Sequence, residues 1–145
     1  MGQTHLLPRE EMLETGKRKK RVTIGIPKDS SPHENRIPLT PQGVELLREN
    51  GHTVLFEAGA GDRAHYFDHD FAECGAKIVK QKEVFTADII LKISAPNLEE
   101  IELLQPNQVV FSLIYLYNQS RETIQKMMEK RINAIGFELL KDGNN

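Results

Sequence analysis

Residues 88–93, which read DIILKI, limit the fold more than any other stretch of the chain. A short and nearly continuous apolar run is typical of a strand that is buried on both faces of a parallel sheet. Shorter runs rich in β-branched and apolar residues occur at 22–26, 53–57, 77–79, 109–113 and 134–137. These runs predict a mainly parallel sheet of about five or six strands.

Helical stretches separate the predicted strands. Thr40 is a favourable N-cap and Pro41 suits the first helical position, so a helix is expected from there to Asn50 and Gly51. Further helices are expected at 68–74, 98–104 and 120–130, with at most one helical turn at 83–86. Strands alternating with helices at this spacing predict an α/β fold, flavodoxin- or Rossmann-like, with helices on both faces of the sheet.

The first 20 residues are expected to form an extension outside the core. Pro8 and the acidic residues after it favour a short helix over 8–15, and Gly16 ends it before the basic run at 17–21. We expect residues 21–145 to form one domain, because a chain of this length is long enough to bury a core.

The overall composition excludes several classes of protein. Hydrophobic residues make up 39%, charged residues 28% and the formal net charge is −2, so no global charge favours nucleic acid or a membrane surface. No apolar run approaches the roughly 18 residues of a membrane span, and the N-terminus lacks the apolar core of a signal peptide. Cys74 is the only cysteine, which excludes an intrachain disulfide. The expected location is the cytoplasm.

Polar residues follow several of the predicted strands at their carboxyl ends, where open parallel sheets bind ligands. The strand ends and the loops after them hold Lys28, Arg36, Lys92, Ser94, Ser112, Tyr115 and Glu138. Arg36 has the geometry to bind a carboxylate through two parallel hydrogen bonds, or it pairs with Glu34 on the surface. Lys92 either reaches solvent at the strand end or faces a ligand, and Tyr115 either donates to a substrate oxygen or fills an edge of the core.

Sequence signatures of cofactors and metals are absent. Residues 58–62 (AGAGD) lack the third glycine of a dinucleotide fingerprint, and we interpret Gly59 and Gly61 as turn residues. The histidines have no HExxH spacing, and His65 and His69 flank an expected helix start, so no metal site is predicted. No GxSxG or Cys–His signature indicates a nucleophilic enzyme.

Two long segments together resemble a known family. The first is IGIPKDSSPHENRIPLTPQGVELLRENGHTVLFEAGAG, and the second is ADIILKISAPNLEEIELLQPNQVVFSL. In this order they resemble the N-terminal domain of the alanine dehydrogenase and proton-translocating transhydrogenase (alpha subunit) family, over about residues 22–140. The resemblance implies that NAD or NADP is bound by a following Rossmann domain, which is not part of this chain. The 145 residues are therefore expected to bind no cofactor and to catalyse no hydride transfer alone.

The resemblance also assigns site residues. Arg36 matches the arginine that holds the substrate carboxylate. The position of a substrate-contacting lysine, two residues after the lysine that matches Lys92, holds Ser94. The position of the active-site histidine holds Tyr115. Serine carries no charge and a tyrosine with a pKa near 10 is a poor general base at neutral pH.

Three functions follow from the resemblance. The first is the substrate-side domain of an alanine dehydrogenase-like enzyme acting on a 2-amino or 2-oxo acid, expected to be a homo-oligomer when full length. The second is a transhydrogenase alpha-subunit domain, with a second nucleotide as substrate and a membrane subunit as partner. The third is a catalytically inactive homologue that binds nucleotide.

Overall fold

The computed structural model describes residues 20–141, so the helix predicted at 8–15 lies outside the described residues. The described part contains one six-stranded sheet in the order β3-β2-β1-β4-β5-β6, and every neighbouring pair is parallel. The strands are β1 (Thr23–Ile26), β2 (Thr53–Glu57), β3 (Lys77–Val79), β4 (Ile89–Ser94), β5 (Val109–Leu113) and β6 (Asn133–Gly136). This arrangement confirms the predicted α/β class and the parallel sheet.

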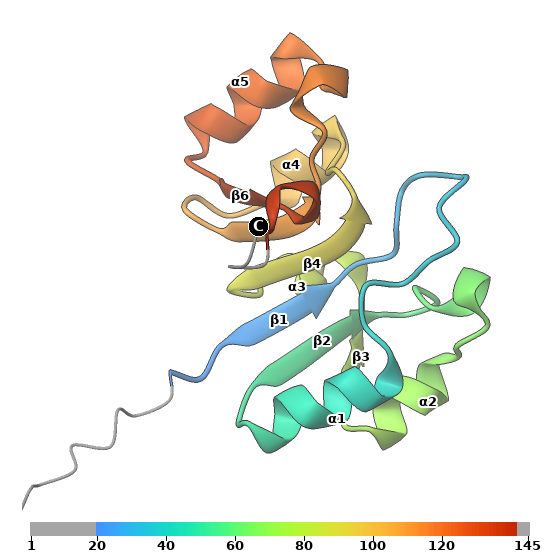
Figure 1. The fold of residues 1–145 in the computed structure, drawn as a ribbon. Helices are drawn as coiled ribbons and strands as arrows, with labels where there is room; N and C mark the ends of the chain where they lie inside the picture. The colour runs from blue at the N-terminus through green and yellow to red at the C-terminus, as the bar shows by residue number, and fades with distance from the viewer. Residues whose placement is uncertain (1–19, 142–145) are drawn as a thin grey trace, which may run out of the picture.

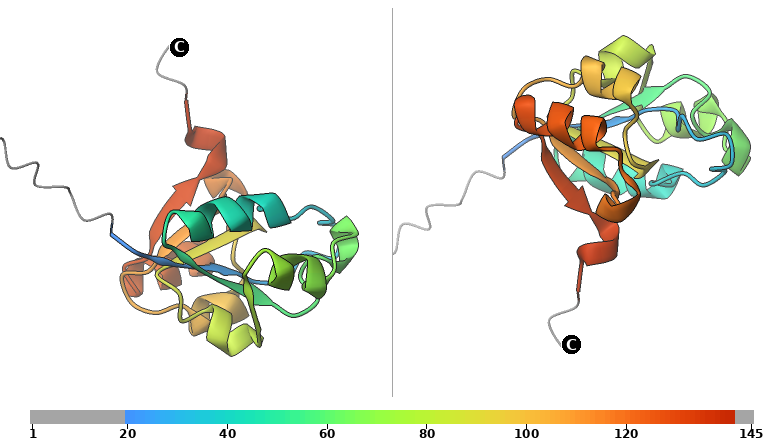
Figure 2. Two further views of the ribbon diagram at one scale, coloured as in Figure 1. Left: turned by 90° about the horizontal axis from the view of Figure 1, so that it is seen from below. Right: turned by 90° about the horizontal axis from the view of Figure 1, so that it is seen from above.

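Helices cover both faces of this sheet (Figures 1 and 2). One face carries α1 (Pro41–Glu49) and α2 (Asp68–Glu73), and the other carries α3 (Gln81–Val84), α4 (Leu98–Leu103) and α5 (Arg121–Glu129). The described chain also contains three short 3-10 helices: η1 (Asp62–Ala64), η2 (Leu116–Asn118) and η3 (Phe137–Leu139). These were not predicted from the sequence. None of the helices within residues 20–141 is long and apolar enough to cross a bilayer.

Each face of the sheet has its own apolar core. Under α1 and α2, the Phe56 and Phe71 rings stack with centroids 3.9 Å apart, beside the fully buried Ile26 and Val44. The core of the opposite face holds the buried residues Leu55, Val84, Phe85, Ala87, Ile90, Ile101, Leu104 and Val110. Burial on both faces explains why the strands at the centre of the sheet are nearly continuous apolar runs.

Side-chain caps fix the starts of the longer helices. The Thr40 hydroxyl accepts a hydrogen bond from the Gly43 backbone N–H at 3.4 Å, and Pro41 occupies the first helical position, as the sequence predicted. The Ser120 hydroxyl accepts from the Thr123 N–H at 3.0 Å at the start of α5. These caps set the direction in which each helix leaves the sheet edge.

Several predicted boundaries differ from the structure by one or two residues, and a physical reason is visible for two of them. The turn predicted at 83–86 is α3, which begins at Gln81 and ends at Val84, because the buried side chains of Val84 and Phe85 anchor its end in the core. The fourth strand begins one residue later than predicted, because the Asp88 carboxylate instead accepts a hydrogen bond from the Thr23 N–H at 2.7 Å.

The sheet has a switch point between β1 and β4. These strands are neighbours, although the chain between them forms β2 and β3 on the other side of β1. The chain after β1 enters α1 on one face, whereas the chain after β4 enters α4 on the opposite face (Figure 1). In open α/β sheets, the crevice for ligands forms beyond the carboxyl ends of the strands at this point.

Candidate functional site

The loop between β1 and α1 holds Arg36 in a bidentate ion pair with Glu34. The Nε and Nη2 atoms of Arg36 each donate to one Glu34 carboxylate oxygen at 2.8 Å, and the Arg36 backbone N–H donates at 2.9 Å. The arginine side chain is 66% exposed and that of Glu34 only 12%. The pairing of Arg36 with Glu34, one of the two alternatives that the sequence left open, is therefore present. The outer part of the guanidinium faces solvent.

The ion pair with Glu34 dominates the electrostatics of Arg36. The hydrogen bonds and the charge of Glu34 raise the pKa of Arg36 above its usual value, and Tyr115 and Asp29 add smaller contributions of the same sign. In return, the hydrogen bond from the Arg36 side chain lowers the pKa of Glu34.

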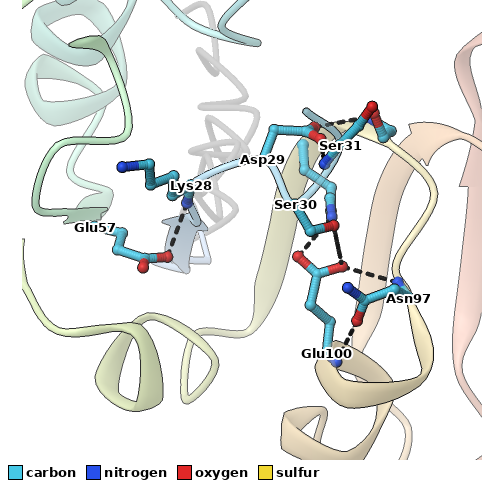
Figure 3. A network of polar contacts seen from close by, with 9 residues as sticks. Lys28, Asp29, Ser30, Ser31, Glu57, Asn97 and Glu100 are labelled. Atoms are coloured by element: carbon cyan, nitrogen blue, oxygen red, sulfur yellow. Dashed lines mark hydrogen bonds and ion pairs between the residues drawn. The ribbon is translucent and has the colours of Figure 1, made fainter. Parts of the chain in front are cut away.

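Asp29 joins the loop after β1 to the end of β4. Its Oδ2 atom accepts a hydrogen bond from the Ser94 backbone N–H at 2.9 Å, and Oδ1 accepts from the Ser31 N–H at 3.0 Å (Figure 3). Because a carboxylate accepts hydrogen bonds more strongly than a neutral oxygen, this contact ties the loop after β1 firmly to the end of β4. Asp29 was not singled out from the sequence.

Lys92 lies beneath the rim of the crevice, not on it. Its Nζ donates to both carboxylate oxygens of Glu100 at 2.7 Å, and the two side chains are 0% and 3% exposed. Of the two alternatives that the sequence left open for Lys92, the one in which it reaches solvent at the strand end is wrong, because a buried carboxylate satisfies the ammonium inside the protein. A direct contact between Lys92 and a ligand stays a prediction.

Glu100 belongs to a wider polar network at the start of α4 (Figure 3). Its Oε2 accepts from the Asn97 backbone N–H at 2.8 Å and from the Ser30 hydroxyl at 3.2 Å, while its own backbone N–H donates to the Asn97 side chain at 2.8 Å. The reciprocal Asn97–Glu100 contacts form a capping box. Glu100 therefore connects the cap of α4, the buried Lys92 and the loop after β1.

A second carboxylate, Glu57 at the end of β2, lies on the other side of this loop. It accepts a hydrogen bond from the Lys28 backbone N–H at 2.8 Å (Figure 3). Burial raises the pKa of Glu57, while the hydrogen bond from Lys28 and its charge act in the opposite direction. Both ends of the segment 28–30 are thus held by acidic side chains.

Tyr115 follows β5 in a left-handed conformation, with φ 42° and ψ 64°. Its backbone N–H donates to Glu138 Oε1 at 2.7 Å and the Ile114 N–H donates to Oε2 at 3.3 Å, and these contacts lower the pKa of Glu138. The tyrosine is 50% exposed, so it does not fill an edge of the core. The structure therefore brings Tyr115 and Glu138 together, as the strand order predicted.

Ser94 and Ser112 differ in position. Ser94 lines an open hollow of about 620 Å³ together with Ser31, Pro96, Asn97, Gln119 and Thr123. Ser112 is fully buried, and its hydroxyl has no hydrogen-bond partner among the described residues. The prediction that Ser112 lies on the rim was wrong, because Ser112 lies within β5, paired with Gly136, and is fully buried.

The described residues do not fit the phosphates of a nicotinamide nucleotide. The loop from β1 to α1 contains no glycine, so its backbone lacks the close approach that a pyrophosphate needs. In the glycine-rich segment 58–62, the Gly59 N–H donates to the Asp68 carboxylate at 2.8 Å, so this donor already has an acidic partner within the protein. Gly59 has a positive φ of 74°, which confirms its interpretation as a turn residue.

The fold defines a doubly wound α/β domain in which Arg36 lies in the loop after β1, Ser94 ends β4 and Tyr115 follows β5. Residues 25–145 match the family described as alanine dehydrogenase/PNT, N-terminal domain, and the chain belongs to that family.

Comparison with individual proteins agrees with this membership. The chain is 36% identical over 118 residues to an alanine dehydrogenase of Staphylococcus saprophyticus, covering 81% of this chain and 32% of the relative. Among solved structures, an L-alanine dehydrogenase is 32% identical with a TM-score of 0.80, covering 84% of this chain and 34% of that one. A transhydrogenase from Sinorhizobium meliloti is 29% identical with a TM-score of 0.78, covering 84% and 36%. The chain thus spans about a third of the length of these proteins.

Proposed function

We propose that this chain is the substrate-side domain of an NAD(P)-dependent oxidoreductase of the alanine dehydrogenase type. The reaction is hydride transfer between a nicotinamide and a 2-amino or 2-oxo acid. The observation that carries the proposal is the Arg36 guanidinium, which is 66% exposed in the loop after β1 at the switch point and is bound by Glu34 along one edge only. The similarity to alanine dehydrogenases over 81% of the chain supports it.

Arg36 anchors the substrate carboxylate in this proposal. A guanidinium is the side chain best suited to this task, because it forms two parallel hydrogen bonds and keeps its charge at any physiological pH. The backbone of its loop is fixed by Asp29 and by Arg63, whose Nη1 donates to the Ser31 carbonyl at 2.6 Å. Support of this kind holds a binding group in place before the ligand arrives.

Ser94 and Tyr115 line the crevice and contact the reacting end of the acid. Tyr115 presents a half-exposed phenol that donates a hydrogen bond to a substrate oxygen, which a neutral tyrosine does at any pH below about 10. The Ser94 hydroxyl orients the substrate through a hydrogen bond and adds no charge. Lys92 supports this site from beneath, because its ion pair with Glu100 holds the end of β4 against α4.

The nicotinamide, which would accept or donate the hydride, is bound by a domain outside this chain. The glycine-free loop after β1 supports this assignment, because the residues of this domain offer no phosphate cradle. The domain's task is accordingly to bind and orient the acid. Full-length assembly into a homo-oligomer in the cytoplasm is part of the same proposal.

The test is an assay of the full-length protein with pyruvate, ammonia and NADH or NADPH. Turnover that depends on pyruvate is expected, with Arg36→Gln lowering kcat/KM for pyruvate about 10- to 100-fold, since a hydrogen bond to a charged group contributes about 1.5–3 kcal/mol. Arg36→Lys retains the charge but not the paired geometry, and an intermediate loss is expected. Nucleotide binding without any turnover would reject the proposal in favour of an inactive homologue.

A transhydrogenase alpha-subunit domain is the second candidate. It is favoured by the TM-score of 0.78 with the Sinorhizobium meliloti protein and by the serine and tyrosine at the two positions where a dehydrogenase of this family is expected to have lysine and histidine. Hydride exchange between NADH and an NADP analogue, without any use of pyruvate, would establish this function. A membrane subunit would then be the expected partner.

A further inference from the structure

The Arg36 guanidinium is only partly occupied by its ion pair. A guanidinium has five N–H donors, which form a side edge at Nε and Nη2 and an end edge at Nη1 and Nη2. Glu34 binds the side edge at 2.8 Å through both of its oxygens. Over residues 20–141, no hydrogen bond involves Nη1, so the end edge stays available to a second carboxylate.

Glu34 is itself firmly held. Its carboxylate also accepts the Arg36 backbone N–H at 2.9 Å, and its backbone N–H donates to the Ser31 carbonyl at 3.3 Å. Arg63 donates to the Ser31 carbonyl at 2.6 Å and to the Glu34 carbonyl at 3.3 Å. The carboxylate is mostly covered, at 12% exposure, whereas the arginine side chain is 66% exposed. The pair therefore has a fixed inner half and an open outer half.

We propose that Glu34 is the positioning residue for ligand binding at Arg36: it holds the side edge so that the end edge is presented to the carboxylate of a small 2-oxo or 2-amino acid. The ligand binds Nη1 and Nη2 while the contact to Glu34 persists. This inference rests on the proposed function, because it takes Arg36 as the carboxylate anchor.

The physical advantage is preorganisation. An unrestrained arginine loses rotamer freedom when it binds a ligand, at a cost of about 0.5–1.5 kcal/mol for such a side chain. Glu34 removes this cost before binding. A competing role for Glu34, in which its carboxylate blocks Arg36 until the ligand displaces it, predicts the opposite response to its removal.

The first experiment observes Arg36 directly by NMR in the 145-residue chain. The Nε–H resonance of Arg36, identified by its absence in Arg36→Lys, is expected to exchange slowly with solvent in the wild type. In Glu34→Gln, which keeps one acceptor oxygen but loses the charge, exchange is expected to be faster. Glu49→Gln is the matched control, because Glu49 is exposed near the end of α1 and the variant makes the same change of charge. It is expected to behave as the wild type.

The second experiment titrates the same proteins with pyruvate. In the wild type, pyruvate is expected to shift the Arg36 resonances while its Nε–H stays protected. Glu34→Gln is expected to bind pyruvate about three- to tenfold more weakly, the equivalent of the ordering cost. In an Arg36→Gln background, Glu34→Gln is expected to have no further effect, which a purely structural role in the loop would not produce.

The outcomes separate this inference from the function on which it rests. Loss of Nε–H protection when pyruvate binds, or tighter binding by Glu34→Gln, would overturn the positioning role and establish Glu34 as a competitor. A protected Nε–H with no response to pyruvate in the wild type would instead overturn Arg36 as the carboxylate anchor. The ion pair between Glu34 and the side edge of Arg36 would then have a structural role only.

Discussion

The Lys92 ammonium donates to both oxygens of the Glu100 carboxylate at 2.7 Å, below the floor of the crevice. Lys92 belongs to β4 and Glu100 to the first turn of α4, so the pair fixes the angle at which the helix leaves the strand. Through Ser30 it also reaches the loop that carries Arg36. A buried ion pair of this kind matters most for holding one geometry, because desolvation offsets most of its Coulomb energy.

Removing one member of this pair is expected to destabilise the domain strongly. Lys92→Met leaves the Glu100 carboxylate buried without its counter-ion, and a loss of about 3–5 kcal/mol in the free energy of unfolding is expected. Urea unfolding measures the change. The double variant Lys92→Met, Glu100→Leu is expected to recover most of the loss, because neither charge remains buried.

Lys82→Met is the matched control for this experiment, because Lys82 is exposed in α3. Its effect is expected to stay within about 0.5 kcal/mol. Equal losses in Lys92→Met and in the double variant would contradict the unpaired Glu100 charge as the cause of the loss.

Asp29 is expected to control the rigidity of the crevice. Asp29→Ala removes the acceptor of the Ser31 and Ser94 backbone N–H groups, so both amides are expected to exchange faster with solvent. A loss of about 1–3 kcal/mol in stability is expected, because hydrogen bonds to a charged group contribute in this range. Hydrogen exchange followed residue by residue is the measurement.

Asp88→Ala provides the control at the opposite end of the same two strands. The Asp88 carboxylate accepts the Thr23 N–H at 2.7 Å, so its removal is expected to speed exchange at Thr23 and not at Ser94. Faster exchange at Ser94 in both variants would indicate general loosening of the sheet, which contradicts a local role for Asp29.

The sequence predicts the sheet well, because a strand that is buried on both faces is a nearly continuous run of apolar residues. The run at 88–93 and the shorter runs at 53–57 and 109–113 correspond to β4, β2 and β5 within one residue. The Thr40-Pro41 signal for α1 also holds, since a cap and a first-turn proline act locally. The 3-10 helices escaped prediction, because single turns depend on tertiary contacts such as the one between Tyr115 and Glu138.

The site is harder to predict, because its contacts join residues that are distant in sequence. Asp29 and Ser94 are separated by 65 residues, and nothing near Asp29 indicates its partner. Glu100 did leave a signal: Asn97 followed three residues later by glutamate is a capping-box pattern, which places Glu100 at the edge where Lys92 ends. The side-chain direction of Ser112 depends on strand register, which its sequence neighbourhood does not fix.

Gly25 allows α3 to approach β1, and a side chain at this position is expected to destabilise the fold. A Cβ atom at residue 25 would lie 2.5 Å from the Val84 backbone carbonyl oxygen. Gly25→Ala is expected to lower the free energy of unfolding by about 1–3 kcal/mol, because a backbone atom must move. Thermal and urea unfolding measure it.

Gly43→Ala is a useful comparison, because Gly43 also lies close to a neighbour. Its added Cβ would meet side-chain atoms of Leu39 and not backbone, and alanine favours the helix by about 1 kcal/mol. An effect within about 1 kcal/mol of zero is therefore expected. A loss as large as that of Gly25→Ala would contradict the distinction between backbone and side-chain contacts.

Glu57 is expected to make the domain less stable as pH rises through the weakly acidic range. Burial raises its pKa in the folded protein above the ordinary value of 4.5, so the folded state binds more protons than the unfolded state between these two values. Stability therefore falls with increasing pH across that interval. Glu57→Gln keeps an oxygen for the Lys28 N–H but does not titrate, so its stability relative to the wild type is expected to rise over the same interval.

Glu138→Gln is expected to show the opposite sign. The pKa of Glu138 is lowered in the folded protein, mainly by the Tyr115 N–H, so the stability of the wild type relative to that variant is expected to rise as pH rises through the folded pKa. Urea unfolding at intervals from pH 3 to pH 7 measures both differences, and the same sign in both variants would contradict burial as the dominant influence on Glu57.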